Sequence, residues 1–406
     1  MARVLIYTSP ARGHLYPAAA IGLELMRRGH YVELHGLSQE LAPLREAGLC
    51  VRGLDAAIEA LPLDDGKAWS AVSALRRVMA TFVARAPHEV RSLDAALSAR
   101  PPDCLLIDVN CLGAAALAER SALPWATFAP YCLPIPSRDA PPFGLGLLPR
   151  RDWLGRLRDG CIQRITRGAL ASFTEPVNQV RRALSVPALT HAADFALTSP
   201  RLLALTSEAF EYPRSDWPNS VRLCGHCCWA PPDARAEPFG AENEEYVLVT
   251  ASTEAQRDAR LLQVALDALA DVPQRVVVTT GAHDPSRFRA PPNARVVRFA
   301  SHATLLPRAQ AVICHGGMGI TQRALSHGVP VCVVPAGRDQ FEVARRVERA
   351  QAGVFLHPRR LSAGNLRRAF VRTVAARSGA QKLAPTLCPR QGAERAANEL
   401  ISLIRG

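Results

Sequence analysis

Short apolar runs recur along the chain, and most of them end in a polar or glycine-containing turn. Runs of this length between turn residues are typical of fully buried strands. In the first half they predict strands over residues 3–8, 31–35, 104–109, 125–129 and 202–206. Between the first two runs, residues 17–28 carry a helical apolar stripe that ends before Gly29. A strand, a helix and a strand in succession predict a doubly wound α/β domain.

The second half of the chain restarts with the same order of elements. Residues 246–250 (YVLVT) predict a strand, the loop ASTEAQ follows, and residues from about 257 to 270 have a helical pattern. Further strands are expected over 276–280 and 294–297. Between the halves, prolines are frequent and periodicity is lost, which predicts a linker. The expected division is a first domain over 1–211, a linker over 212–238, a second domain over 239–386 and a C-terminal segment over 387–406.

Residues 309–340 (AQAVICHGGMGITQRALSHGVPVCVVPAGRDQ) combine a strand, a glycine-rich turn, a helix and a second strand. His315 opens the turn, and Gly316, Gly317 and Gly319 lack the Cβ atoms that would hold a ligand away from the backbone. The helix that follows directs its free N–H groups and the positive end of its dipole at the turn. The pattern predicts an anion-binding site, although a tight turn without a ligand stays an alternative.

Composition supports a folded two-domain protein. The chain has 406 residues, of which 48% are hydrophobic and 21% charged, so disorder is excluded. The N-terminal residues lack the apolar core of a signal peptide, and no apolar run is long enough to cross a bilayer. We therefore expect a soluble cytoplasmic protein without integral membrane association.

The charge and the cysteine content do not add a nucleic-acid or metal function to this expectation. The net charge is +13, but the arginines are scattered and aromatic residues make up only 6%, so nucleic-acid binding is not expected. Of the eleven cysteines, Cys224, Cys227 and Cys228 come nearest to a metal cluster, together with His226. No second pair stands at the spacing of a zinc finger, so no metal site is expected.

A polar triplet follows the last strand of residues 309–340, at the end where parallel sheets bind ligands: Arg338, Asp339 and Gln340. With this triplet, the stretch resembles the donor-binding signature of family 1 glycosyltransferases of the GT-B fold. It is most similar to the actinobacterial enzymes that glycosylate macrolides, enediynes and other polyketides, and the resemblance covers essentially the whole chain. It implies two Rossmann-like domains that face each other across a cleft, with a C-terminal helix that crosses back to the first domain.

The first domain offers a candidate general base. His14 is expected at the tip of the first loop, and Asp108 at the end of a strand in the same half. A histidine whose second nitrogen donates to a buried carboxylate is held in one tautomer and becomes a better base. The resemblance implies that His14 is the base and that Asp108 orients it. A packed or capping imidazole is the alternative for His14.

The resemblance also assigns a donor site in the second domain. It implies that His315 and the amides of Gly317 and Gly319 stabilise the leaving diphosphate, and that Asp339 and Gln340 bind the hydroxyls of the donor sugar. The remaining positions that match the family are Phe299 at the nucleobase, and Ser252, Thr253 and Thr321 near the phosphates. Ile320 and Ser301 depart from the family pattern, and Ile320 puts one side-chain contact to phosphate in doubt. No D-x-D motif is placed to hold a metal, so the donor is expected to bind without one.

These residues together with the resemblance imply an inverting, metal-independent transferase with no cofactor. It would move a hexose or deoxyhexose from a dTDP- or UDP-sugar to a hydroxyl of an apolar natural product in antibiotic biosynthesis. Residues 131–149, rich in proline, would line the acceptor cleft together with parts of 56–99, or would form a surface loop packed on their own domain. Two other functions stay open, a non-catalytic auxiliary partner and a membrane-surface enzyme with a lipid-linked acceptor. A homodimer is also compatible with the sequence.

Overall fold

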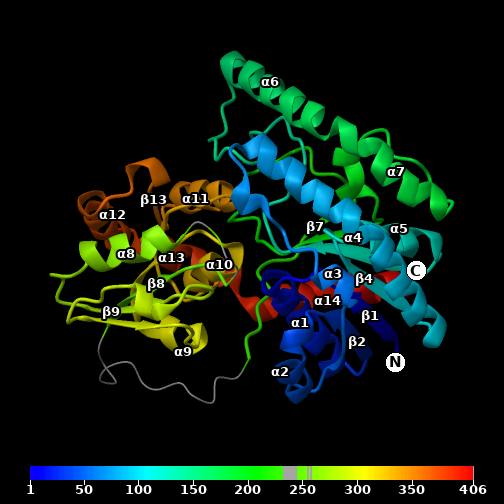
Figure 1. The fold of residues 1–406 in the computed structure, drawn as a ribbon, viewed down its shortest axis with the longest axis horizontal. Coiled ribbons are helices and arrows are strands. Elements are labelled where there is room, and N and C mark those ends of the chain that lie inside the picture. Colours follow the sequence, from blue (N-terminus) through cyan, green and yellow to red (C-terminus); the bar gives the residue numbers. More distant parts are fainter. Residues whose placement is uncertain (232–244, 254–255, 257, 406) are drawn as a thin grey trace.

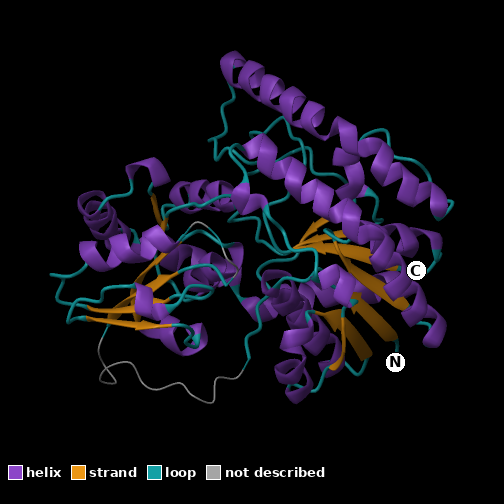
Figure 2. Ribbon diagram, in the orientation of Figure 1, coloured by secondary structure: helices purple, strands orange, loops and turns teal. Residues whose placement is uncertain are grey.

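The computed structural model describes residues 1–231, 245–253, 256 and 258–405. It contains two parallel sheets, each flanked by helices, which form two domains side by side (Figure 1 and Figure 2). The fold class expected from the sequence, two Rossmann-like domains, is confirmed.

The first sheet has seven strands in the order β3-β2-β1-β4-β5-β6-β7, all parallel. Its central strands are continuous apolar runs because helices cover both faces of the sheet. The strands are β1 (Arg3–Tyr7), β2 (Tyr31–Gly36), β3 (Cys50–Gly53), β4 (Cys104–Asp108), β5 (Trp125–Ala129), β6 (Leu202–Ala204) and β7 (Val221–Leu223). The main helices are α1 (Arg12–Arg27), α2 (Leu41–Glu46), α3 (Ala56–Glu59), α4 (Ala71–Ala99), α5 (Leu112–Arg120), α6 (Trp153–Leu170) and α7 (Thr174–Ala183).

The second sheet has six parallel strands in the order β10-β9-β8-β11-β12-β13. They are β8 (Tyr246–Thr250), β9 (Arg275–Thr279), β10 (Ala294–Val297), β11 (Ala309–Cys314), β12 (Val331–Val333) and β13 (Gly353–Phe355). Helices α8 (Ala259–Ala268), α9 (His302–Leu305), α10 (Met318–Ser326), α11 (Gln340–Arg349), α12 (Ala363–Ala375) and α13 (Arg377–Leu383) surround them.

The last helix, α14 (Pro389–Arg405), returns to the first domain, where it packs on α1, β4 and β5 (Figure 1). Ala396 and Leu400 are wholly buried in the same core cluster as Ile6, Leu25 and Phe128. The C-terminal segment therefore supplies one side of the first domain's core.

Several element boundaries differ from those expected. Helix α1 begins at Arg12 rather than near residue 17, because Leu15 N–H already donates to Ala11 C=O, 3.0 Å away. Pro17 lies inside the helix instead of opening it. The helical region over 56–99 divides into α3, a short 3₁₀ turn and α4. The start of the helix expected near 257 lies outside the described residues, and α8 is described from Ala259.

Three short strands, β3, β7 and β13, were not expected from the sequence. Strand β7 pairs with β6, so the first sheet extends into the range assigned to the linker, 212–238. The remainder of that range from 232 lies outside the described residues. Strands of three or four residues at a sheet edge carry too few buried positions to show a periodic pattern.

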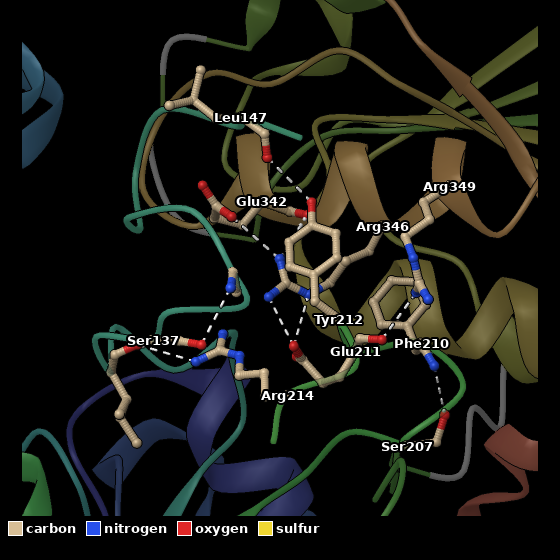
Figure 3. Close-up of polar contacts among 12 residues, drawn as sticks. Ser137, Leu147, Ser207, Phe210, Glu211, Tyr212, Arg214, Glu342, Arg346 and Arg349 are labelled. Atoms are coloured by element: carbon tan, nitrogen blue, oxygen red, sulfur yellow. Dashed lines mark hydrogen bonds and ion pairs between the residues drawn. The ribbon is translucent and has the colours of Figure 1, made fainter. Parts of the chain in front are cut away.

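A buried charged cluster joins the two domains (Figure 3). Arg346 of α11 is 2% exposed and donates to Glu211 Oε2 through Nε and Nη2, at 3.0 and 2.8 Å. Its Nη1 lies 3.2 Å from Glu342 Oε2, and its guanidinium carbon is 4.3 Å from the centre of the Tyr212 ring. Because a buried charge is costly without its partners, this cluster fixes how the domains meet.

Candidate functional site

His14 and Asp108 form a hydrogen-bonded pair at the carboxyl edge of the first sheet. Asp108 is the last residue of β4 and is 0% exposed, whereas the His14 side chain is 17% exposed. His14 Nδ1 lies 2.8 Å from Asp108 Oδ2. Since an ionised carboxylate only accepts hydrogen bonds, Nδ1 carries the hydrogen, and in the neutral ring Nε2 is the basic nitrogen. His14 lies in the first turn of α1, rather than in the loop expected from the sequence.

The Asp108 carboxylate is held ionised by its neighbours. Burial alone would raise its pKa, but attraction to His14 and the bonds from His14, Ser9 and Asn110 bring the pKa below its usual value. Ser9 donates to Oδ2 through N and Oγ, at 2.9 and 2.6 Å, and Asn110 N donates to Oδ1 at 3.0 Å. The residue that orients the imidazole is therefore itself fixed.

An aromatic side chain lies against His14. The Tyr131 and His14 ring centres are 5.7 Å apart, and the rings are inclined at 50°. Tyr131 Oη donates to Asn110 Oδ1 at 2.8 Å, so the same backbone turn that supports Asp108 also holds this tyrosine. Tyr131 is the first residue of the 131–149 stretch that was expected to line the acceptor cleft, whereas Asn110 was not expected at the site.

Asp339 comes to the same place from the second domain. Its Oδ2 is buried and accepts no hydrogen bond from the described residues. Burial raises the pKa of this carboxyl to about 6, while the positive charge of Arg338 and of His14 acts in the opposite direction. The structure thus brings the candidate base and the candidate sugar-binding carboxylate, one from each domain, within electrostatic reach of each other.

The glycine-rich turn has the geometry of an anion site. Gly316 has φ +93°, which favours glycine, and a Cβ at Gly317 would stand 2.7 Å from His315 Nε2. The imidazole of His315 therefore lies over the backbone at the N-terminus of α10. His315 Nδ1 is 4.0 Å from Asp258 Oδ2. Gly319 follows in the first turn, where its backbone has open space beside it.

A chain of side-chain hydrogen bonds connects the other loops of the candidate donor site. Gln340 Oε1 accepts from the amides of Ala336 and Gly337, at 2.7 and 3.1 Å. Its Nε2 donates to Gln256 Oε1 at 2.7 Å, and Gln256 Nε2 donates to Ser252 Oγ at 2.9 Å. Gln340 is 2% exposed, so in this structure it braces the loops rather than facing open solvent.

Asp258 supports the same loops from beneath. Its Oδ2 accepts from Ser252 N at 2.6 Å, and its Oδ1 lies 2.7 Å from His283 Nε2. Asp258 and Gln256 were both missed in the sequence. Gln256 lies in the loop ASTEAQ, and the position of this loop after a predicted strand was the one feature of the sequence that pointed to it.

The remaining residues of the candidate donor site differ in exposure. Phe299 follows β10 and is 58% exposed, with the guanidinium carbon of Arg12 5.9 Å from its ring centre. An exposed ring at this position can stack on a base, and Thr253 is also exposed. Thr321 is 0% exposed, and its Oγ1 lies 3.9 Å from Cys314 Sγ. Its hydroxyl therefore faces the core, and the structure does not bring it to the surface of the site.

Residues 144–147 of the expected acceptor loop are held by the second domain. The amides of Gly144 and Gly146 donate to Glu342 Oε1 at 3.0 and 2.9 Å, and Arg345 Nε donates to Gly146 C=O at 2.7 Å. A Cβ at Gly146 would stand 2.8 Å from Phe341 Cβ. The loop is thus anchored on α11 at one end, while Tyr131 at its other end lies beside His14.

The cysteine-rich segment near residue 226 is packed rather than arranged around an ion. Among the residues that the structure describes, no group of three His, Cys, Asp or Glu side chains is placed to hold a metal. His226 is 2% exposed, and burial lowers its pKa to about 3. Within the same described ranges, no helix has the length and apolar character needed to span a membrane.

Comparison with known proteins decides the family. The chain is 35% identical to 4'-demethylrebeccamycin synthase of Lentzea aerocolonigenes, over 100% of this chain and 99% of that protein. The chain belongs to the natural-product glycosyltransferases of the GT-B fold. Residues 263–403 of this glycosyltransferase also match the family described as erythromycin biosynthesis protein CIII-like, C-terminal domain. The resemblance and the enzyme class expected from the sequence are confirmed.

Solved structures agree on the fold of the glycosyltransferase. A calicheamicin glycosyltransferase superposes with a TM-score of 0.76 at 19% identity, covering 100% of this chain and 98% of that chain. The glycosyltransferase VinC in complex with dTDP superposes with a TM-score of 0.67 at 22% identity, covering 100% of each chain.

Proposed function

We propose that this glycosyltransferase is an inverting, metal-independent enzyme that transfers a hexose or deoxyhexose from a dTDP- or UDP-sugar. The acceptor would be a hydroxyl group of an apolar natural product of the polyketide, macrolide or enediyne type. The observation that carries the proposal is the pairing of His14 with the buried Asp108, within electrostatic reach of Asp339.

In the proposed reaction, the acceptor oxygen attacks the anomeric carbon from the side opposite the diphosphate. Its proton passes to His14 Nε2, and the bond from the anomeric carbon to the phosphate oxygen breaks with both electrons on the oxygen. Asp108 stabilises the imidazolium that forms, through the 2.8 Å contact to Nδ1. A single displacement of this kind inverts the anomeric configuration.

The leaving diphosphate would be stabilised by groups of the protein itself. His315 and the amides of the turn 316–319 concentrate positive potential at the N-terminus of α10. Preorganised donors at the position of a developing anion are the usual alternative to a metal ion in this step. Activity that persists with excess EDTA would support this part of the proposal.

The donor sugar would be held by Asp339, whose Oδ2 has no hydrogen-bond partner among the described residues. Gln340 would contribute by fixing the loop, or directly after a change of rotamer. The choice of dTDP is favoured by the structural likeness to VinC, whose solved complex contains dTDP. A natural-product acceptor is favoured by the relationship to 4'-demethylrebeccamycin synthase.

The test is transfer by the isolated chain, offered dTDP- and UDP-hexoses with a panel of aromatic and macrocyclic acceptors. We expect release of the nucleoside diphosphate, and a product of inverted anomeric configuration. Thermal shift with dTDP and UDP ranks the nucleotides, because a ligand at a hundredfold excess over its Kd adds about 2.7 kcal/mol of stability. Nucleotide binding without hydrolysis or transfer under any condition would favour an auxiliary, non-catalytic role instead.

A further inference from the structure

Exposed large hydrophobic side chains are concentrated in one segment of the first domain. Eleven such side chains are exposed among the described residues, and six of them lie between positions 145 and 165. The six are Leu145, Leu148, Trp153, Leu154, Leu157 and Ile165. Single exposed hydrophobic residues are ordinary on a protein surface, but a concentration of them marks an interaction site.

Helix α6 carries the main part of this segment on one face. Trp153, Leu157, Cys161 and Ile165 are spaced by four residues and are all exposed, with Trp153 at 70%, Leu157 at 59% and Ile165 at 60%. Side chains at this spacing lie on one side of a helix. These four residues are called the α6 face below. The two buried residues of the helix, Gly155 and Leu170, do not belong to this face.

The position of α6 leaves this face open. The helix packs on α4, and it forms the outer rim of the first domain, at the top of the view in Figure 1. A face on an outer helix is convex, so it fits a broad partner surface better than a peptide that needs a groove.

Positive charge surrounds the α6 face. Between positions 150 and 167 the chain has six arginines and two aspartates, a net charge of +4. Arg158 and Arg167 are paired with Asp159 and Asp194, at 2.8 and 3.1 Å. Arg156 and Arg164 are exposed and form no ion pair within the described ranges. The two arginines therefore offer their charge to an external anionic partner.

We propose that the α6 face docks this glycosyltransferase onto an anionic lipid bilayer. An apolar helical face bordered by arginines is the pattern of a helix that lies in the membrane interface. Tryptophan is favoured at that depth, and arginine can bury its stem while its head group reaches the lipid phosphates. A second copy of the chain fits less well, because pairing two α6 faces would bring arginines of like charge together. The docking does not depend on the acceptor or on the chemistry of His14.

The experiment is co-sedimentation of the full chain with vesicles of phosphatidylcholine alone, and of phosphatidylcholine mixed with phosphatidylglycerol. We expect binding to the anionic vesicles only, weakened by salt. The variant Trp153→Ser/Leu157→Ser/Ile165→Ser should lose on the order of a hundredfold or more in partitioning. Arg156→Gln and Arg164→Gln should each lose about fivefold.

A matched control is Val371→Ser on α12 of the second domain, where Val371 is 60% exposed like Ile165. It should bind vesicles like the unaltered chain. Transfer to a water-soluble acceptor should be equal in all these variants, which shows that they are folded. The proposal is overturned if the unaltered chain ignores anionic vesicles, or if the α6 variants bind them as well as Val371→Ser does. It is also overturned if the α6 variants instead abolish a dimer or the binding of an acidic protein.

Discussion

Arg338 of the second domain donates two hydrogen bonds to Asp65 of the first domain, from Nε to Oδ2 at 2.9 Å and from Nη2 to Oδ1 at 3.0 Å. Arg338 has φ +54°, a conformation in which a residue other than glycine is strained. The next residue is Asp339, the proposed ligand of the donor sugar. The ion pair therefore holds the strained backbone next to Asp339 in one conformation.

Replacement of Asp65 should impair donor use. We expect Asp65→Asn to lower kcat/KM for the donor by roughly tenfold, because a bidentate, largely buried pair is lost and the 336–340 loop is released. Asp64→Asn is the matched control, since Asp64 pairs with Arg77 at the surface, with 37% and 41% of the side chains exposed. The measurement is kcat/KM for the donor, from steady-state kinetics with varied donor concentration. Equal effects of the two variants would contradict a role for Asp65 in positioning Asp339.

His14→Ala should abolish most transfer, by on the order of 10² to 10⁴ in kcat, while nucleotide binding stays close to normal. Asp108→Asn should be less damaging because the imidazole remains. Both changes act on one proton transfer, so the double variant should be hardly worse than His14→Ala alone. Losses that add fully would mean that the two residues act separately and that another base must be sought.

His315→Ala should reduce kcat by on the order of 10² to 10³, because one donor to the developing diphosphate is removed. His327→Ala tests the opposite end of α10, at its C-cap, and should leave turnover nearly unchanged. The measurement is the rate of nucleoside diphosphate release at saturating acceptor. Near-normal turnover of His315→Ala would remove this residue from the proposed leaving-group site.

Exchanging parts of the 131–149 loop for those of a relative should separate two effects. A chimera over 131–139 should change acceptor preference without raising the donor KM. A chimera that also replaces 144–147 should raise the donor KM, because it breaks the bonds to Glu342 and Arg345 on the helix that begins at Gln340. An unchanged donor KM in the longer chimera would show that this anchor does not influence the donor site.

Stability should fall in acid because of His226. Burial lowers its pKa to about 3, whereas an exposed histidine titrates near 6.5. Between these values the unfolded chain binds a proton that the folded chain does not, so the free energy of unfolding falls as the pH falls through this range. The maximum slope is about 1.4 kcal/mol per pH unit. Urea unfolding at pH 7.5 and pH 5 should show a smaller loss in His226→Leu than in the unaltered chain, and equal losses would contradict this account.

Much of the fold could be predicted because the central strands are uninterrupted apolar runs. The expected ranges of β5, β8 and β10 coincide with the structure, and those of β1 and β4 are one residue too long. The short edge strands could not be found, since β3 exposes three of its four residues. Helix α1 was started too late because Pro17 looks like a first helical residue, although α1 accommodates it in its interior.

The candidate site was predictable where residues follow the ends of strands and could be matched to the family. His14, Asp108, His315 and Asp339 are of this kind. The contacts between loops were not predictable, because they join distant parts of the chain. Asp65 and Arg338 are 273 positions apart, and Gln256 and Gln340 are 84 positions apart. Only the docking of the domains and loops makes these residues neighbours. Thr321 fits the family pattern, but its helical position turns its hydroxyl to the core.

The return of α14 makes the first domain discontinuous along the chain. A fragment that stops within 212–238 would lack Ala396, Leu400 and the rest of the helix that closes its core, whereas 245–388 retains every strand of the second sheet. Both chain ends lie in the first domain, and the polypeptide passes between the domains twice (Figure 1). To produce the first domain by itself, residues 389–405 should therefore be fused to it through a short linker. For the same reason, a C-terminal truncation should unfold the first domain before the second, although the second domain is closer to the C-terminus in sequence.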